Sequence, residues 1–426
     1  MVQEKNNLLL LGSDRSGGLE MKKQKYVNIL LGCCCLICIF SSFSMAAPVD
    51  HQSFQQFLGS FYSEAAKKGI TRVTYDRAFA GVTAPDDSIL KKAAYQPEFT
   101  TEIWDYLDAR VNPRSIDDGR IMAGVYGDLL QRIESQFGVE ASVILAIWSM
   151  ETSYGAALLR TSRLYYVPRS LATLAFADKR RQKFARSQLV ATLEIVQAGD
   201  VTLEQLTGSW AGAMGHTQFI PTSFLAYGVD MNGDGRRDIW NSIPDALATA
   251  ANLLHSNKWR TGKPWGYEVI VPSNKARLEG KTKTLAEWQQ LGFSRPGGAV
   301  FKDLQEKAEL KMIGGDSGPG FLMLRNFFVL KRYNNSDFYA LAVGLLADRL
   351  AGKKKMQQSW PRPAGALSVE EKFELQELLL KKGFYSGEID GRIGSNSRKG
   401  IREFQIQQGT KVDGQASKTA LEALRQ

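Results

Sequence analysis

The stretch ILAIWSMETSYG, residues 144–155, sets one acidic side chain, Glu151, at the end of a run that is otherwise apolar, aromatic or small. If residues 141–154 form a helix, Glu151 shares a face with Ile147 and Trp148 one turn earlier. Such surroundings penalise the ionised carboxylate and therefore raise its pKa. A carboxyl group that stays protonated near neutral pH can serve as a general acid.

The alternative for Glu151 is structural, because a glutamate near a helix end often pairs with a neighbouring arginine, here Arg160. A second segment weakens this alternative. Residues 208–240, GSWAGAMGHTQFIPTSFLAYGVDMNGDGRRDIW, crowd glycines and small residues around Ser209 and Gln218. This pattern is typical of places where the backbone comes close to a ligand.

Other hydrolytic chemistries lack the residues that they need. The three histidines, His51, His216 and His255, do not form a metal-ligand pattern, so we exclude a zinc hydrolase. All four cysteines lie within residues 33–38, and the chain has no G-x-S-x-G motif. A cysteine or serine nucleophile therefore has no support.

The N-terminal segment has the pattern of a secretory signal peptide. Met21-Lys-Lys-Gln-Lys25 is a basic start, Val27–Phe40 is a largely apolar run of 14 residues, and Ser44-Met-Ala46 is a small-residue cleavage pattern. The apolar run is shorter than the roughly 20 residues of a membrane span. We expect translation to start at that methionine, and export with loss of residues 1–46. A lipid anchor on Cys33 is the less favoured alternative.

The charge of the chain is basic, with a net value of +10. Loss of the predicted signal segment removes five Lys or Arg and three Asp or Glu residues, which leaves +8 on the mature chain. A basic exported protein favours an acidic partner, and the bacterial wall with its carboxylates is one in the right place. Simple solubility explains the charge equally well. Nucleic acid is not an expected partner outside the cytoplasm.

The patterning divides the 426 residues into several parts. Residues 51–260 carry apolar side chains every three to four positions, which predicts helices. Short β-type runs then alternate with glycine-rich turns, and they predict a small antiparallel sheet. These runs are 267–271, 309–313, 321–324 and 327–330. A helix from Phe338 to about Leu350 closes this part.

Residues 351–366 contain charges and prolines but no periodicity, and they predict a flexible linker. Residues 367–426 hold three helical patterns and two Asp-Gly pairs, Asp390-Gly391 and Asp413-Gly414. The length of this part is near the lower limit for independent folding. A module of this size more often binds something than catalyses a reaction.

Three motifs in order carry a resemblance: ETSYG from Glu151, GSWAGAMGHTQFIPTSF from Gly208, and RYNNSDFYA from Arg332. Together they resemble the lytic murein transglycosylases of the membrane-bound B type, glycoside hydrolase family 103. The resemblance spans roughly residues 51–350. It implies a lysozyme-like fold for predicted domain 47–350.

By this resemblance, Glu151 is the catalytic residue. It first protonates the glycosidic oxygen between N-acetylmuramic acid and N-acetylglucosamine, and then accepts the proton of the muramic acid's own C6 hydroxyl. The product is a 1,6-anhydromuramyl end. No second acidic residue stands in the motifs nearest Glu151, whereas ordinary glycoside hydrolases need two carboxylates. The substrate-binding residues implied by the resemblance are Ser209, Gln218, Tyr333, Asn334 and Tyr339.

The loop DMNGDGRRD, residues 230–238, matches the first part of an EF-hand. Asn241 stands where the EF-hand has a bidentate glutamate. A weak structural calcium ion and a metal-free turn remain equal alternatives, and no catalytic role is implied. The candidate calcium ligands are Asp230, Asn232, Asp234, Arg236, Asp238 and Asp245.

The C-terminal part resembles the type 1 peptidoglycan-binding domain over nearly all of residues 367–426. We expect Asp-Gly to form its tight turns and Leu378, Ile401 and Phe404 to pack a three-helix core. The predicted fold class is therefore mainly α (α+β), with a lysozyme-like catalytic domain, a small antiparallel β-sheet and a small three-helix binding domain.

The function predicted from these features is lytic transglycosylase action on peptidoglycan glycan strands in the periplasm, by a monomer that needs no cofactor for catalysis. Envelope protein complexes are candidate partners. Two alternatives stay open: a non-catalytic peptidoglycan-binding or scaffolding protein, which would have no need of Glu151, and a hydrolytic muramidase, which would need a group that activates water.

Overall fold

The structure, a computed structural model, describes residues 51–94 and 101–426. The predicted signal peptide, its start at Met21 and the cysteines lie outside the described residues. Export and the lipid anchor on Cys33 therefore stay predictions.

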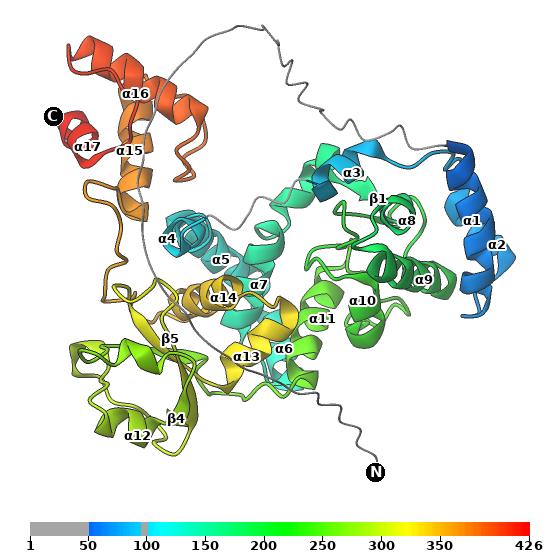
Figure 1. The fold of residues 1–426 in the computed structure, drawn as a ribbon, viewed down its shortest axis with the longest axis horizontal. Helices are drawn as coiled ribbons and strands as arrows, with labels where there is room; N and C mark the ends of the chain where they lie inside the picture. Colours follow the sequence, from blue (N-terminus) through cyan, green and yellow to red (C-terminus); the bar gives the residue numbers. More distant parts are fainter. Residues whose placement is uncertain (1–50, 95–100) are drawn as a thin grey trace, which may run out of the picture. The chain divides into compact units, whose positions relative to one another are not determined.

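Helices dominate the chain up to residue 256, as the apolar spacing predicted (Figure 1). One short antiparallel pair of strands, β1 (Tyr165–Tyr166) and β2 (Thr207–Gly208), joins two of the loops. The helices are α1 (His51–Ala66), α2 (Arg72–Phe79), α3 (Asp87–Ala94), α4 (Ile103–Asp108), α5 (Pro113–Val125), α6 (Gly127–Phe137), α7 (Ala141–Thr152), η1 (Ala156–Leu159), η2 (Thr161–Arg163), α8 (Val167–Ala177), α9 (Gln182–Ala198), α10 (Pro221–Tyr227) and α11 (Ile243–Ser256).

Helix α7 is the central helix of the largest core. It packs against α5, α6, α11 and a later helix, α14 (Asp337–Leu350), so every face of its middle turns is covered. Residues 143–149 are all buried. The segment Ala141–Leu159 also has the length and mean hydropathy, 1.3, of a membrane-crossing helix, but half of that window lies inside the fold. Its apolar character is therefore that of a core helix.

The sheet after the first helices has four antiparallel strands in the order β3-β6-β5-β4. Its own core is built around Trp288 and Phe293, whose rings meet edge to face with centroids 4.8 Å apart. The elements of this part are β3 (Gly266–Val269), η3 (Ala276–Leu278), β4 (Thr282–Thr284), α12 (Leu285–Gln290), η4 (Pro296–Gly298), β5 (Lys307–Lys311) and β6 (Gly320–Met323).

The prediction of a strand at residues 327–330 is wrong, because this run lies in helix α13 (Arg325–Tyr333). A four-residue apolar run does not distinguish a buried strand from a buried helix. The run is apolar throughout because α13 packs between α11 and α14. Asn326 holds its start, since its side chain donates to the carbonyl oxygens of Arg260 and Lys263 over 2.9 and 2.8 Å.

Residues 351–366 are held in place, in contrast to the predicted flexible linker. The Trp360 ring stacks on Phe321 of the sheet with centroids 6.1 Å apart. The backbone N–H of Gln358 donates to the Glu268 carboxylate over 2.7 Å. Composition did not reveal these contacts because each joins residues about 40 to 90 positions apart.

The C-terminal part is a three-helix unit, as predicted, made of α15 (Val369–Lys381), α16 (Ser395–Gln407) and α17 (Lys418–Arg425). Ile401 and Phe404 are buried in its core and Leu378 is partly buried against it. The described residues all belong to one compact unit, Val49–Gln426.

Both Asp-Gly turns of this unit are held by a glutamine side chain. Gln376, which is fully buried, accepts the backbone N–H of Gly391 over 2.7 Å, and Gln405 accepts that of Gly414 over 2.9 Å. The two glycines have φ of +70° and +66°, a conformation that glycine adopts at little cost.

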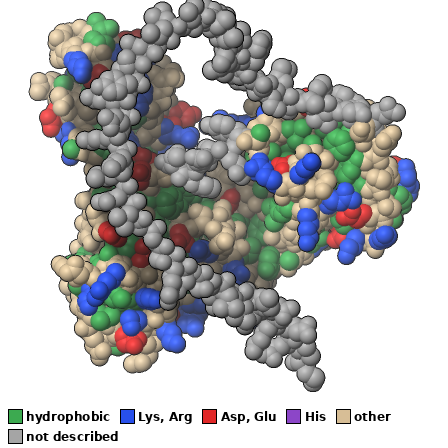
Figure 2. Space-filling model, in the orientation of Figure 1, with side chains coloured by type: hydrophobic (Ala, Val, Ile, Leu, Met, Phe, Trp, Pro, Cys, Tyr) green, Lys and Arg blue, Asp and Glu red, His purple; other side chains and the backbone are tan. Residues whose placement is uncertain are grey.

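On the face shown in Figure 2, Lys and Arg side chains are scattered over the surface among fewer Asp and Glu side chains. On this face the positive charge of the chain is therefore spread out and does not form a single basic strip.

Candidate active site

Three consecutive left-handed residues end helix α7. Ser153, Tyr154 and Gly155 have φ of +50°, +57° and +91°. A non-glycine residue in this region costs about 1–3 kcal/mol, and such strain clusters at functional sites. The surroundings fix it, because the Tyr154 hydroxyl donates to the carbonyl oxygen of Ser115 over 2.8 Å. The turn presents the end of the helix, where Glu151 lies, next to the loop at residues 209–219.

His216 packs against this turn as a neutral ring. The Trp148 indole N–H donates to His216 Nδ1 over 3.3 Å, so that nitrogen acts as an acceptor. Burial lowers the pKa of His216. The Thr152 hydroxyl donates to the His216 carbonyl oxygen over 2.7 Å and accepts the N–H of Gly155. His216 thus links helix and loop, which explains its place in the motif without an acid–base role.

The Glu151 side chain is partly buried at the C-terminal end of α7. Burial raises its pKa to about 7. Two weaker effects act in the opposite direction: the Tyr339 hydroxyl donates to Glu151 Oε1 over 2.6 Å, and the positive charge of Arg110 favours the carboxylate. A carboxyl group with a pKa near neutrality can give a proton and take one back under the same conditions.

Tyr339 and Tyr333 form a stacked pair beside this carboxyl, with ring centroids 6.2 Å apart and ring planes at 11°. Burial and then the charge of Glu151 raise the pKa of Tyr339 well above its ordinary value, so the phenol remains a donor. Tyr333 donates to the carbonyl oxygen of Thr217 over 2.6 Å. The pair therefore connects the glutamate to the loop that contains Gln218.

Arg110 is a residue of the site that the motifs did not indicate. It lies in the loop between α4 and α5, with its guanidinium 3.8 Å from the centroid of the Tyr106 ring. Arg160, the arginine considered as a partner for Glu151, is exposed at the end of η1. Arg110 could not be found from the sequence, because it lies 41 positions before Glu151 and no motif includes it.

The other predicted substrate-binding residues lie in three different settings. The Ser209 hydroxyl oxygen accepts the N–H of Ala213 over 3.0 Å and holds its own turn. Gln218 has φ of +48°, and its amide donates to the carbonyl oxygen of Gly215 over 2.9 Å. Asn334 is exposed at the end of α13. The structure thus joins Glu151, Tyr339 and Tyr333 through a hydrogen bond and a ring stack. The hydrogen bond from Tyr333 to Thr217 brings the Gln218 loop to them.

The acidic loop is closed by its own hydrogen bonds. Asp230 accepts the backbone N–H groups of Gly233 and Gly235 over 2.7 and 2.8 Å. Asp245 is fully buried, and its two oxygens accept the N–H groups of Met231 and Asp238 over 2.8 and 2.9 Å. Burial raises the pKa of Asp245.

The remaining candidate ligands of this loop have similar local roles. Asn232, Asp234 and Asp238 each accept a backbone N–H within two or three residues, and Arg236 donates its own N–H to Asp234. Within residues 51–94 and 101–426, no group of three or more His, Cys, Asp or Glu side chains is placed to hold a metal ion. The donor types fit a calcium loop, but the arrangement fits it only in part.

Comparison with known proteins agrees with this site. The model of the transglycosylase SLT domain family matches residues 53–348, and that of a peptidoglycan binding domain matches residues 370–424. Membrane-bound lytic murein transglycosylase B of Escherichia coli (strain K12) is 30% identical over 244 residues, which is 57% of this chain. The chain spans 65% of the length of that relative.

Solved structures give the same result. SltB3 from Pseudomonas aeruginosa, in complex with NAG-anhNAM-pentapeptide, is 41% identical, with a TM-score of 0.69 over 88% of this chain and 100% of that chain. The Escherichia coli lytic transglycosylase Slt35 in complex with calcium is 25% identical, with a TM-score of 0.59 over 70% and 92% of the two chains.

These matches confirm the resemblance and the fold class predicted from the motifs: a mainly helical, lysozyme-like fold with a small antiparallel sheet and a helical binding domain. Because the first family match covers well over half of the residues, the chain belongs to the transglycosylase SLT domain family.

Proposed function

We propose that this protein is a peptidoglycan lytic transglycosylase in which Glu151 acts first as an acid and then as a base. One observation carries the proposal: a single carboxyl with a pKa of about 7 is held by a phenol that remains protonated. The names of the related proteins, which are lytic transglycosylases, support the substrate class.

In the first step, the Glu151 carboxyl gives its proton to the glycosidic oxygen and the bond to the anomeric carbon of N-acetylmuramic acid breaks. The resulting carboxylate keeps the hydrogen bond from Tyr339, which stabilises its charge. In the second step, the C6 hydroxyl of the same sugar attacks the anomeric carbon and passes its proton to Glu151. The carboxyl is regenerated, and a 1,6-anhydro ring closes without water.

The groups that act on Glu151 are consistent with this scheme. Among the described residues, the groups that shift its pKa after burial are the Tyr339 phenol and the Arg110 guanidinium, neither of which is a carboxylate. An inverting or retaining hydrolase places a second carboxyl about 5–9.5 Å from the first. An internal hydroxyl as nucleophile requires no such group.

Mass spectrometry of the muropeptides released from purified sacculi tests the proposal. We expect anhydro products from the unaltered protein and none from Glu151→Gln. Glu377→Gln, which changes an exposed residue of α15, is the matched control and should keep full activity. Products heavier than the anhydro forms by one water would establish a muramidase. Equal release by Glu151→Gln would remove Glu151 from the mechanism and favour the binding-protein alternative.

We also propose export to the periplasm and action as a monomer. The matched relative is named a membrane-bound murein transglycosylase, and the signal-peptide pattern supports export. Intact-mass measurement of the exported protein should give a chain that begins near Ala47. A mass increased by acyl chains, with Cys33 as the first residue, would instead establish the lipid anchor. Light scattering at micromolar concentration should give the mass of one chain.

A weak, structural calcium ion in the 230–238 loop is a further proposal. Its support is the series of oxygen donors at EF-hand positions and the calcium complex of Slt35. The ion would brace the loop, and the proton transfers at Glu151 do not involve it. Thermal unfolding in calcium chloride and in EDTA tests this, with Asp230→Asn as the control that should lose the difference. Equal midpoints in the two buffers would count against bound calcium.

A further inference from the structure

A second cleft lies outside the proposed active site, between α4 and the three-helix binding domain. Its volume is about 680 Å³, within the usual range for ligand pockets. Trp104 and Asp105 of α4 line one side, and Arg392 and Arg398 of the binding domain line the other. The mechanism at Glu151 uses none of these residues.

Buried ion pairs fix the two sides of this cleft relative to each other. Arg362 donates both of its terminal nitrogens to the two oxygens of Asp108, over 2.8 and 2.6 Å. Lys372 reaches the same carboxylate over 2.7 Å. The Asp108 side chain is 8% exposed, and Arg362 and Lys372 are each 18% exposed, so little water screens these contacts.

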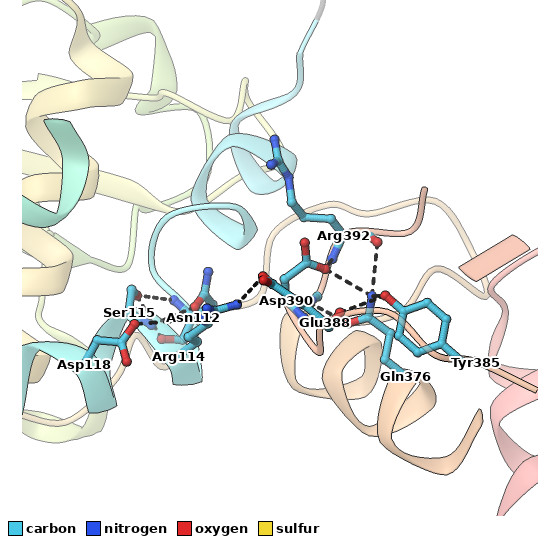
Figure 3. Close-up of polar contacts among 10 residues, drawn as sticks. Asn112, Arg114, Ser115, Asp118, Gln376, Tyr385, Glu388, Asp390 and Arg392 are labelled. Atoms are coloured by element: carbon cyan, nitrogen blue, oxygen red, sulfur yellow. Dashed lines mark hydrogen bonds and ion pairs between the residues drawn. The ribbon is translucent and has the colours of Figure 1, made fainter. Parts of the chain in front are cut away.

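A second contact, at the surface, joins the same two parts. Arg114 at the start of α5 donates to Glu388 of the binding domain over 3.0 Å (Figure 3). This contact and the ion pairs of Asp108 hold the cleft in shape before any ligand binds. Binding therefore does not require free energy to bring the two sides together.

Arg392 and Arg398 remain as cations without an acidic partner among the described residues. Asp105 and Asp108 pair with Lys372, and Asp108 with Arg362, so these acids do not neutralise them. Among the residues that the structure describes, Glu102 is the one other acidic residue that lines the cleft. Both arginines are exposed, and an arginine fork fits a carboxylate with two parallel hydrogen bonds.

The backbone under Arg392 is rigid. The buried Gln376 amide donates to the Arg392 carbonyl oxygen over 3.1 Å and accepts the N–H groups of Asp390 and Gly391. Figure 3 shows the guanidinium extending away from this network, on the side opposite to Gln376. The network thus fixes the backbone from which the Arg392 guanidinium extends out of the binding domain.

Trp104 adds an aromatic surface to the cleft. Its ring packs on the main core on one side and keeps part of its surface exposed. Tryptophan at a binding site supplies a large rigid contact area for sugar rings and peptide backbone at a small cost in side-chain entropy.

We propose that this cleft is a binding subsite for the free carboxylates of a peptidoglycan stem peptide, held by Arg392 and Arg398 and packed on Trp104. This rests on the proposed function only for the choice of ligand. The site recognises the peptide branch of the substrate, whereas Glu151 acts on the glycan.

Calorimetric titration of the full-length Glu151→Gln protein, which leaves the ligand uncleaved, tests the subsite. The probes are a disaccharide-peptide with free carboxylates and the same compound with every carboxylate amidated. We expect the free acid to bind about 10-fold tighter than the amide, because the ion pairs that are lost involve two exposed arginines and each is therefore weak. Arg392→Ala/Arg398→Ala should weaken the acid about 10-fold and leave the amide unchanged.

The matched control is Lys381→Ala/Lys382→Ala, which removes the same charge from exposed positions of the same domain. It should bind like the parent protein. Equal weakening by both double variants would show general attraction to a basic domain and overturn the subsite. Equal binding of acid and amide would overturn it as well. Thermal midpoints of the variants check that the fold is intact.

A separate readout distinguishes this inference from the proposed function. Anhydro-product release from sacculi by the unaltered protein reports on Glu151 alone. Arginine-dependent binding of the free acid without anhydro products would leave the subsite standing and remove the proposed activity. Release of anhydro products, together with equal binding of the free acid and the amide, would support the proposed activity and overturn the subsite.

Discussion

The hydroxyl of Tyr339 donates to Oε1 of Glu151 over 2.6 Å, although 188 positions separate the two residues. Helices α14 and α7 pack along each other and bring them together. The bond favours the carboxylate, while burial favours the neutral acid and is the larger effect. The pKa of about 7 is the balance of these two effects and the charge of Arg110, which also favours the carboxylate.

Tyr339→Phe should therefore raise the pKa of Glu151 further and slow the reaction. A hydrogen bond to a charged group is worth about 1.5–3 kcal/mol, which corresponds to a roughly 10- to 100-fold loss of kcat. Because the glutamate must be protonated to act as acid, the alkaline limb of the pH profile should move to higher pH. Tyr333→Phe, which loses only the bond to Thr217, should leave that limb in place. An unchanged limb in Tyr339→Phe would disprove the electrostatic role.

The pH dependence of activity should follow the raised pKa. If Glu151 acts as the acid, kcat/KM should fall about tenfold per pH unit above about 7, because the protonated fraction falls at that rate. Turbidity clearing of sacculi between pH 5 and 9 measures this. A profile that stays flat up to pH 9 would mean that another group gives the proton.

The raised pKa of Glu151 should also make the folded state less stable at higher pH. The folded protein holds the Glu151 proton up to about pH 7, whereas the unfolded chain releases it near the ordinary glutamate pKa of 4.5. The folded state therefore loses stability as pH rises from about 4.5 to 7, by up to about 3 kcal/mol. Glu151→Gln cannot lose this proton. Its thermal midpoint should exceed that of the parent by a few degrees at pH 8 and match it at pH 4.5.

Gly155→Ala should disturb the turn after α7. The backbone there has φ of +91°, and a Cβ atom would lie 2.7 Å from Cε1 of His216. We expect a loss of roughly 2–4 kcal/mol in the free energy of unfolding, together with reduced activity, because strain and a clash add. Gly199→Ala is the matched control: φ is +81°, and no atom lies within 4 Å of its added Cβ. Chemical denaturation that gives equal losses for both variants would show that the contact with His216 is unimportant.

Asp108→Asn should loosen the binding domain from the catalytic part. It leaves the largely buried Arg362 and Lys372 without this counterion, and breaking one side of a buried pair costs about 3–5 kcal/mol. Limited proteolysis within residues 353–366 should become faster. Asp118→Asn removes only an exposed partner of Arg114 at 3.8 Å and should change nothing measurable. Equal cleavage rates for Asp108→Asn and the parent would contradict this role.

The sequence was sufficient to predict the features that depend on residues close together in the chain. The apolar environment of α7 followed from the residues around Glu151, and the pKa of about 7 agrees with that inference. The Asp-Gly turns were equally visible, since a tight turn with positive φ favours glycine.

The features that the sequence did not reveal depend on distant contacts. Arg110 acts on Glu151 from a loop outside all three motifs, and the left-handed conformation of Ser153 and Tyr154 has no residue-type signal because neither is glycine. The 351–366 segment has the composition of a flexible linker, yet Trp360 and Arg362 anchor it on surfaces that only the folded chain assembles.

The two glutamine clamps of the binding domain hold loops of different length. Gln376 precedes its aspartate by 14 positions and Gln405 precedes its own by 8. The longer loop contains Tyr385 and Glu388, and it is the one that reaches Arg114. The clamp at Gln376 thus keeps in shape the loop through which the binding domain contacts α5, whereas the clamp at Gln405 closes a shorter turn.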